Sequence, residues 1–238
     1  MKKFLLIAIT ILASSCAPTY IPNIRNSPMF TDKGEVQLNF QVGNGLNGQG
    51  AWALSEHFGV MANYSYLKRS GDEEDNIDYR KHTFGEGGVG YFKNTEDMFF
   101  EFFAGYGEGM GASDDALSFL GSSGTATAAG NYKRYFFQPA FGMNKKTVFV
   151  SFVPRFSLVE FTEFSSGGVR YVVNEDPTLF FEPAVIGRVN FHDNFYFIFQ
   201  GGFSVPVTDD PFFEYRTFQT STGIGVRFGG KKALKERE

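Results

Sequence analysis

The stretch that decides the fold is NFYFIFQGGFSV, residues 194–205. Phe195 and Phe197 fall on one side of this stretch, whereas Tyr196 and Gln200 fall on the other. A repeat of two residues is that of a β-strand with one apolar and one polar face. The pattern returns along the chain and predicts an all-β domain with ten antiparallel strands, eight being the second choice. The predicted strands are 34–43, 47–55, 58–68, 79–93, 97–109, 131–144, 146–158, 177–191, 194–206 and 214–228.

The N-terminus carries an export signal. Lysines at positions 2 and 3 precede the apolar stretch 4–12, which is too short to span a bilayer, and the small residues 13–15 follow. Residues 1–15 are therefore predicted to be a signal peptide. The small residues before Cys16, the one cysteine of the chain, resemble a bacterial lipobox, although Ala13 stands where Leu is usual. The resemblance implies cleavage before Cys16 and lipidation of this residue. The alternative is an ordinary signal peptide with an incidental cysteine.

The rest of the chain divides into three parts. Residues 16–33 are polar, contain three prolines and have no periodicity, so they are predicted to be a lipid-anchored linker that leads to the first strand. Residues 34–228 form the predicted barrel domain, whose strands are near the length that crosses a bilayer at a tilt. Residues 229–238 are a charged tail, predicted to lie in the periplasm.

The lengths of the connections predict an orientation. Short turns at 55–57, 93–96, 144–145 and 192–193 alternate with long connections at 69–78, 110–130, 159–176 and 207–213. In up-and-down strands this alternation gathers the short turns at one end of the barrel and the long loops at the other. Outer-membrane barrels place such turns in the periplasm and such loops outside the cell. We therefore expect both termini, and a lipid on Cys16 in the inner leaflet, on the periplasmic side.

Charged residues indicate which face is enclosed. Every lysine between residues 34 and 228 lies at a predicted strand end or turn, whereas single Glu and Arg residues occupy the polar face in mid-strand. Opposite charges on this face are expected to pair inside a narrow lumen, because an unpaired buried charge is costly. The predicted lumen charge network is Glu86, Glu101, Arg134, Arg155, Glu182, Arg188 and Arg227. The alternative is a soluble lipocalin-like barrel with its apolar face inside, around an apolar ligand.

Three prolines oppose this interpretation. Pro139, Pro154 and Pro183 lie inside predicted strands, where a proline removes one hydrogen bond of the ladder. We expect their rings to point outward with the aromatic residues and to mark bulges or strand ends.

The last predicted strand ends in TGIGVRF, residues 222–228, which is similar to the C-terminal assembly signal of outer-membrane proteins, although a tail follows it here. Over residues 34–228 the chain resembles the small outer-membrane β-barrel proteins of Gram-negative bacteria, with a lipoprotein-type signal peptide added. The resemblance rests on architecture. It implies outer-membrane lipid and the outer-membrane assembly machinery as partners, and an unidentified partner for the extracellular loops. A net charge of −4 gives no reason to expect nucleic acid.

The expected function is non-catalytic, with a structural or surface-interaction role or a narrow pore for small solutes. Ten strands enclose far less space than the 16–18 strands of open channels. No cofactor and no metal are expected, since the acidic run 72–75 is interpreted as a solvated loop. The catalytic alternative is an outer-membrane hydrolase that uses His82, the one histidine predicted at the loop rim, near Ser70 and Asp78.

Overall fold

The computed structural model describes residues 18–69, 80–95, 97–115, 126–145, 147–173, 175–208 and 211–229. The signal peptide, Cys16 and the tail beyond residue 229 lie outside these ranges. The regular elements of the described residues are all β-strands. Over the same ranges, no helix has the length and apolar character needed to span a bilayer.

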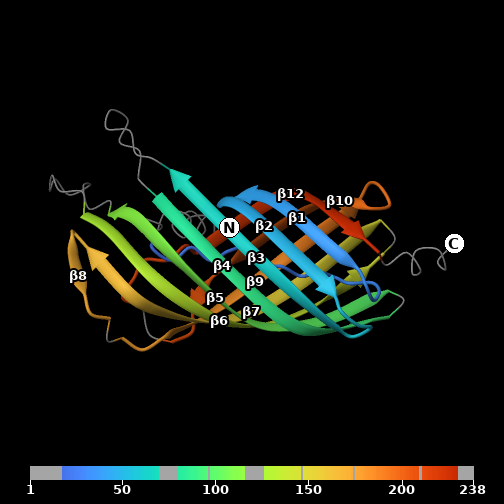
Figure 1. Cartoon of the computed structure of the whole chain (residues 1–238), viewed down its shortest axis with the longest axis horizontal. Coiled ribbons are helices and arrows are strands. Elements are labelled where there is room, and N and C mark those ends of the chain that lie inside the picture. Colours follow the sequence, from blue (N-terminus) through green and yellow to red (C-terminus); the bar gives the residue numbers. More distant parts are fainter. Residues whose placement is uncertain are drawn as a thin grey trace, which may run out of the picture.

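Ten long strands form a closed antiparallel barrel, which confirms the predicted fold class (Figure 1). Neighbours along the chain pair with one another, and the β1–β12 and β7–β9 pairings complete the ring. Two short strands add to this barrel: β8 (Val169–Tyr171) pairs with β7, and β11 (Val205–Pro206) pairs with β9. The ten are β1 (Val36–Gly43), β2 (Gly45–Ala53), β3 (Phe58–Arg69), β4 (Arg80–Asn94), β5 (Met98–Asp115), β6 (Ala126–Asn144), β7 (Val148–Ser166), β9 (Thr178–Asn190), β10 (Phe195–Phe203) and β12 (Phe218–Phe228).

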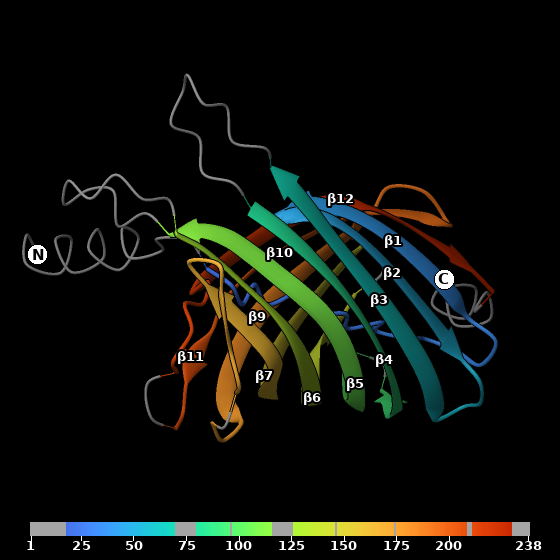
Figure 2. The same cartoon turned by 60° about the vertical axis from the view of Figure 1, so that its left-hand side comes forward.

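The connections differ from the prediction at the loop end. Strands β5, β6 and β7 are 18, 19 and 19 residues long and run into the predicted loops 110–130 and 159–176 (Figure 2). A two-glycine turn, with φ of 58° at Gly167 and 78° at Gly168, folds β7 back onto β8. At the same end, Asn44 alone joins β1 to β2. Long and short connections therefore do not alternate strictly.

The apolar face of the strands is outside. Mid-strand rings such as Phe40, Phe137 and Phe199 are about half exposed around the ring, whereas Glu101 and Arg155 on the opposite face are fully buried. A lipocalin-like barrel has the reverse arrangement, so this alternative is wrong. An apolar belt on this scale is costly in water and suits hydrocarbon.

The three prolines lie side by side in adjacent strands. Pro154 pairs with Pro183, and the pairs that flank them place Pro139 opposite Pro154. The β6–β7 ladder is interrupted at 138–140 and 153–155, while the β7–β9 ladder continues through Pro154. In an antiparallel sheet the peptide N–H and C=O of a residue point to one neighbouring strand only. Pro139 and Pro154 therefore each lack a donor toward the other strand. Both missing hydrogen bonds fall at one place between β6 and β7, called a seam here. The one register shift in this strand pair lies at Asn131/Tyr132, so the expected bulges at the prolines are wrong.

Pro183 opens a second seam. The β9–β10 pairing stops at Ala184↔Gly202, and its register places Phe203 opposite Pro183. The amide of Ser204 donates to Thr217 O on the other side, toward β12. The C=O of Phe203 belongs to the same trans peptide group as this N–H and points in the opposite direction, toward β9. There it meets Pro183, which has no N–H to donate.

The exterior assignment predicts the effect of one charged substitution. Phe199 lies at the centre of β10 and is 50% exposed, whereas Phe195, on the same face, begins the strand and is 45% exposed. We expect Phe199→Arg to lower the free energy of unfolding in lipid vesicles by about 2–4 kcal/mol, and Phe195→Arg by about 0–1 kcal/mol, since the cost falls toward the membrane interface. Urea titration of the two refolded variants measures both. Equal costs would contradict a membrane-facing β10.

Candidate functional site

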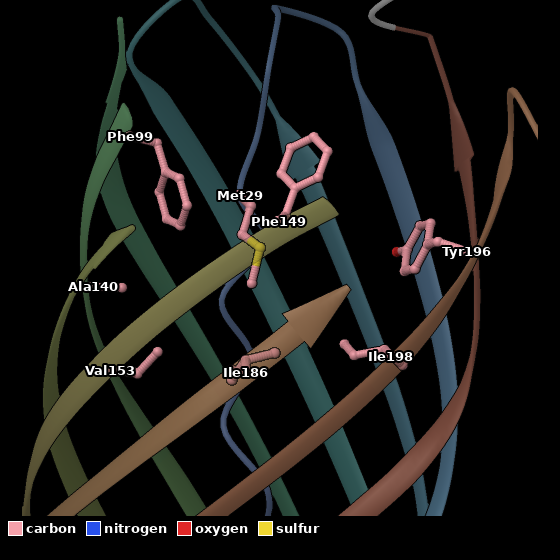
Figure 3. Packing of buried hydrophobic residues seen from close by; sticks show 8 residues of the cluster. All are labelled: Met29, Phe99, Ala140, Phe149, Val153, Ile186, Tyr196 and Ile198. Carbon is pink, nitrogen blue, oxygen red and sulfur yellow. The ribbon is translucent and has the colours of Figure 1, made fainter. Parts of the chain in front are cut away.

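A segment of the chain itself fills the barrel. Residues 18–33, called the lumen segment here, precede β1, and residues 18–30 are buried inside the ring of strands. The sequence predicts residues 16–33 to be a linker that starts at the short-turn end of the barrel. The described part of this segment instead starts at the loop end and runs down the lumen. Figure 3 shows the part around Met29 between the strands.

The lumen segment is held at the loop end by backbone hydrogen bonds. The amides of Thr19 and Tyr20 both donate to Glu214 O, each over 3.0 Å, and the amide of Arg216 donates to Tyr20 O over 2.9 Å. Residues 214–216 lie between β11 and β12, on the side of the barrel where the long connections gather. A parallel bridge between Tyr20 and Tyr215 completes this attachment.

An aromatic cluster surrounds Tyr20. Its ring lies 5.3 Å from Tyr132, 5.1 Å from Phe180 and 6.1 Å from Phe213, measured between ring centroids. These separations are typical of favourable edge-to-face and tilted pairs. His82 belongs to the same region: its ring is fully buried, and Nε2 lies 2.8 Å from the Tyr132 hydroxyl. The residues predicted to assist it, Ser70 and Asp78, lie outside the described residues.

Four residues of the predicted charge network meet at mid-lumen. Glu86 pairs with Arg134 and, over 3.6 Å, with Arg155; Arg155 in turn donates from Nε to Glu182 Oε2 over 2.8 Å. All four side chains are fully buried. The strands that carry them, β4, β6, β7 and β9, converge on one point of the lumen segment.

That point is Asn23. Its amide nitrogen donates to Glu86 Oε1 over 2.8 Å, and its Oδ1 accepts from Arg134 and, over 3.3 Å, from Arg155. Its backbone carbonyl accepts from Arg155 as well, over 3.2 Å. A carboxamide can donate and accept at once, so Asn23 satisfies both signs of the charge network.

Arg25 is a further buried charge, outside the predicted network. Its Nη1 donates to Gln219 Oε1 over 2.7 Å, and its Nε donates to Glu182 O over 3.1 Å. The Glu182 carboxylate lies 4.0 Å from Nη2. The same Nη2 lies 3.5 Å from Phe203 O, the carbonyl to which Pro183 cannot donate. The lumen segment thus supplies a donor that the barrel wall lacks.

Nearer the short turns, charged side chains bind the lumen segment directly. Glu101 accepts from Ser27 Oγ over 2.9 Å and from the amide of Phe30 over 3.0 Å. Arg188 donates to Pro28 O over 3.1 Å. Arg227, the last predicted member of the network, has its guanidinium carbon 5.9 Å from the centroid of the Phe149 ring.

Met29 packs the part of the lumen nearer the short turns. Its side chain is fully buried among apolar residues of five strands, and its φ of 51° lies in the left-handed region (Figure 3). A non-glycine residue there costs of order 1–3 kcal/mol and persists where its surroundings hold it. The hydrogen bonds of Ser27 and Phe30 on either side hold it here. The residues packed with Met29 are Phe99, Ala140, Phe149, Val153, Ile186, Tyr196 and Ile198.

The lumen offers no metal centre within the described ranges, where no three His, Cys, Asp or Glu side chains form a group that could hold an ion. The acidic runs at 72–75 and 209–210 fall outside those ranges. Sequence reasoning missed Tyr20, Asn23, Arg25 and Ser27, because it took an aperiodic polar stretch for a linker. One signal was available: this stretch carries large apolar residues, which a solvated linker does not need. They are Tyr20, Ile21, Ile24, Met29 and Phe30.

Comparison with known proteins adds little beyond architecture. No family model matches the chain, and no curated protein matches its sequence. Among solved structures, it is similar to the translocator domain of the autotransporter NalP from Neisseria meningitidis, at 11% identity and a TM-score of 0.48, over 82% of this chain and 86% of that one. A likeness at this level carries no argument about function. The chain forms an outer-membrane-type β-barrel. Its closed strand pairing and its apolar exterior are the features of this architecture.

The contacts of Arg25 predict a large effect of truncation. Arg25→Ala removes the buried guanidinium that donates to the main-chain oxygens of Glu182 and Phe203 and to Gln219 Oε1. We therefore expect the free energy of unfolding to fall by about 3–5 kcal/mol. The control is Arg170→Ala, which breaks the exposed Arg170–Glu163 ion pair and is expected to cost at most about 1 kcal/mol. Similar losses in the two variants would contradict the role assigned to Arg25.

A double-mutant cycle tests the link between Arg25 and the seam. Pro183→Ala restores an N–H opposite Phe203 O, so Arg25→Ala is expected to cost less in that background than in the wild type. Chemical denaturation of the wild type, the two single variants and the double variant gives the coupling energy. Strict additivity would show that Arg25 does not compensate for Pro183.

Proposed function

We propose that this chain is a non-catalytic outer-membrane protein, a barrel closed by its own N-terminal segment, with a structural or surface-interaction role at its loop end. The observation that carries this proposal is the lumen segment, buried over residues 18–30 and hydrogen-bonded to strands on all sides of the barrel. A lumen filled in this way is a scaffold and leaves no open passage. Interaction with other molecules is then left to the ends of the barrel.

The apolar exterior supports the location. Outward rings on every long strand suit outer-membrane lipid as the immediate partner, and the export signal supports passage to that membrane. The closing strand β12 ends in Phe228, as in the assembly signal it resembles, so the outer-membrane assembly machinery is the proposed folding partner. By analogy with such barrels, the short turns face the periplasm and the long loops face outward.

The structure gives less support to the alternatives. A narrow pore for small solutes would need the lumen segment to leave, against the buried bonds of Asn23 and Arg25. A hydrolase would need His82 to reach substrate, but its ring is fully buried and Nε2 is occupied by the Tyr132 hydroxyl. A nucleophile or base must lie within reach of the reacting group. Acylation of Cys16 remains part of the proposal, on the strength of the signal sequence alone.

Electrical recording tests the closed state. We expect the wild-type protein, refolded in a planar bilayer, to show no stepwise conductance. Replacement of residues 18–30 by a Gly/Ser stretch of equal length removes the buried contacts and is expected to produce conductance steps. If that variant does not refold, Asn23→Ala/Arg25→Ala is the milder substitute, with Arg170→Ala as the silent control. Steady conductance of the wild type would overturn the proposal of a closed barrel.

A further inference from the structure

The route of the lumen segment points to a second role for the barrel: we propose that it carries its own N-terminus through the membrane. The chain that precedes Pro18 would then emerge among the long loops, while the C-terminus stays with the short turns. The inference rests on the proposed function, because it requires the barrel to span a membrane. It reverses the expectation that both termini lie on the same side.

The contacts of the lumen segment follow strand β4 from one end to the other. β4 begins after the long connection at Arg80 and ends before a short turn at Asn94. The Tyr20 cluster includes Phe84, near the start of β4; Asn23 binds Glu86; and Phe30 O accepts from Asn94, at its end. These contacts occur in the same order along both stretches of chain. The segment therefore traverses the lumen from the loop end to the turn end without doubling back.

The end of the lumen segment that leads into β1 lies at the short turns. Thr31 donates from its amide and its hydroxyl to Glu35, and the amide of Gly34 donates to Ala53 O over 2.9 Å. Ala53 ends β2 just before the short turn at 55–57. Lys33 is exposed there. The chain thus leaves the lumen at the short turns and enters β1.

The C-terminus of the described chain lies at this same end. β12 ends at Phe228, which pairs with Val36 at the start of β1. A Cβ placed on Gly229 would lie only 2.7 Å from Gly34 O, so Gly229 is next to the exit of the lumen segment. The first and last described residues are therefore at opposite ends of the barrel.

This route has a consequence for any lipid on Cys16. Two residues of chain reach at most about 7 Å, and Pro18 is at the loop end. An acyl group on Cys16 would then anchor the protein in the leaflet beside the long loops, and not in the inner leaflet. The barrel would act as the conduit that displays the modified N-terminus on the outer face.

Epitope accessibility on intact cells tests the inference. One epitope is inserted between Ala17 and Pro18, a second within residues 70–79 to mark the loop side, and a third after Glu238 to mark the turn side. We expect antibody or protease to reach the first epitope together with the second, and the third only after permeabilisation. An N-terminal epitope that behaves like the C-terminal one would overturn the inference.

A second measurement avoids the insertion, which by itself can displace the segment. In the mature chain with Cys16→Ser, the variants Ala17→Cys and Lys33→Cys form a matched pair, the first next in sequence to Pro18 at the loop end and the second exposed at the turn end. A membrane-impermeant maleimide, added to vesicles whose barrel orientation is known from the loop epitope, should label Ala17→Cys from the loop side and Lys33→Cys from the opposite side. Labelling of both from one side would overturn the inference. Loss of the wild type from the membrane on alkaline carbonate washing would instead refute the proposed function itself.

Discussion

The constraint on which this structure depends is that every polar group enclosed by the barrel needs a partner. The strands bring Glu86, Glu182, Arg134 and Arg155 into a space closed to solvent, where an unpaired charge is very costly. Within the wall these four side chains pair with one another. The lumen segment completes their hydrogen bonds, because Asn23 adds its carboxamide and its main-chain carbonyl, and Arg25 adds its guanidinium beside Glu182.

The same segment compensates for weakness in the wall. Proline is rare in central strands because it removes a ladder hydrogen bond, yet three prolines lie in one row across β6, β7 and β9. The consequence is visible at Pro183. There the carbonyl of Phe203 accepts a hydrogen bond from Arg25, which lies inside the lumen. Wall and segment are therefore complementary, and their stabilities are coupled. A barrel of this sequence that closed without its segment would leave the buried Glu101 carboxylate without the donors that Ser27 and Phe30 supply.

Which elements of the structure the sequence predicts depends on whether they leave a local pattern in it. The ten strands were predictable because a two-residue period persists whatever each strand pairs with, and so was the inward direction of Glu101, Arg155 and Glu182. The ends of β5, β6 and β7 were not, since pairing between neighbours extends these strands through Gly- and Ser-rich residues with weak alternation. The path of the lumen segment was harder still. An extended chain without internal hydrogen bonds has no period, and its partners lie as far away in sequence as Glu182 and Gln219.

The sequence by itself therefore determined the all-β architecture and the division into apolar and polar faces, because alternation is a local property of the backbone. Only the tertiary structure decided which groups close the lumen and at which end the chain enters it. Those features arise from contacts between residues some 60 to 195 positions apart, and such contacts exist only once the ring of strands has closed around the segment.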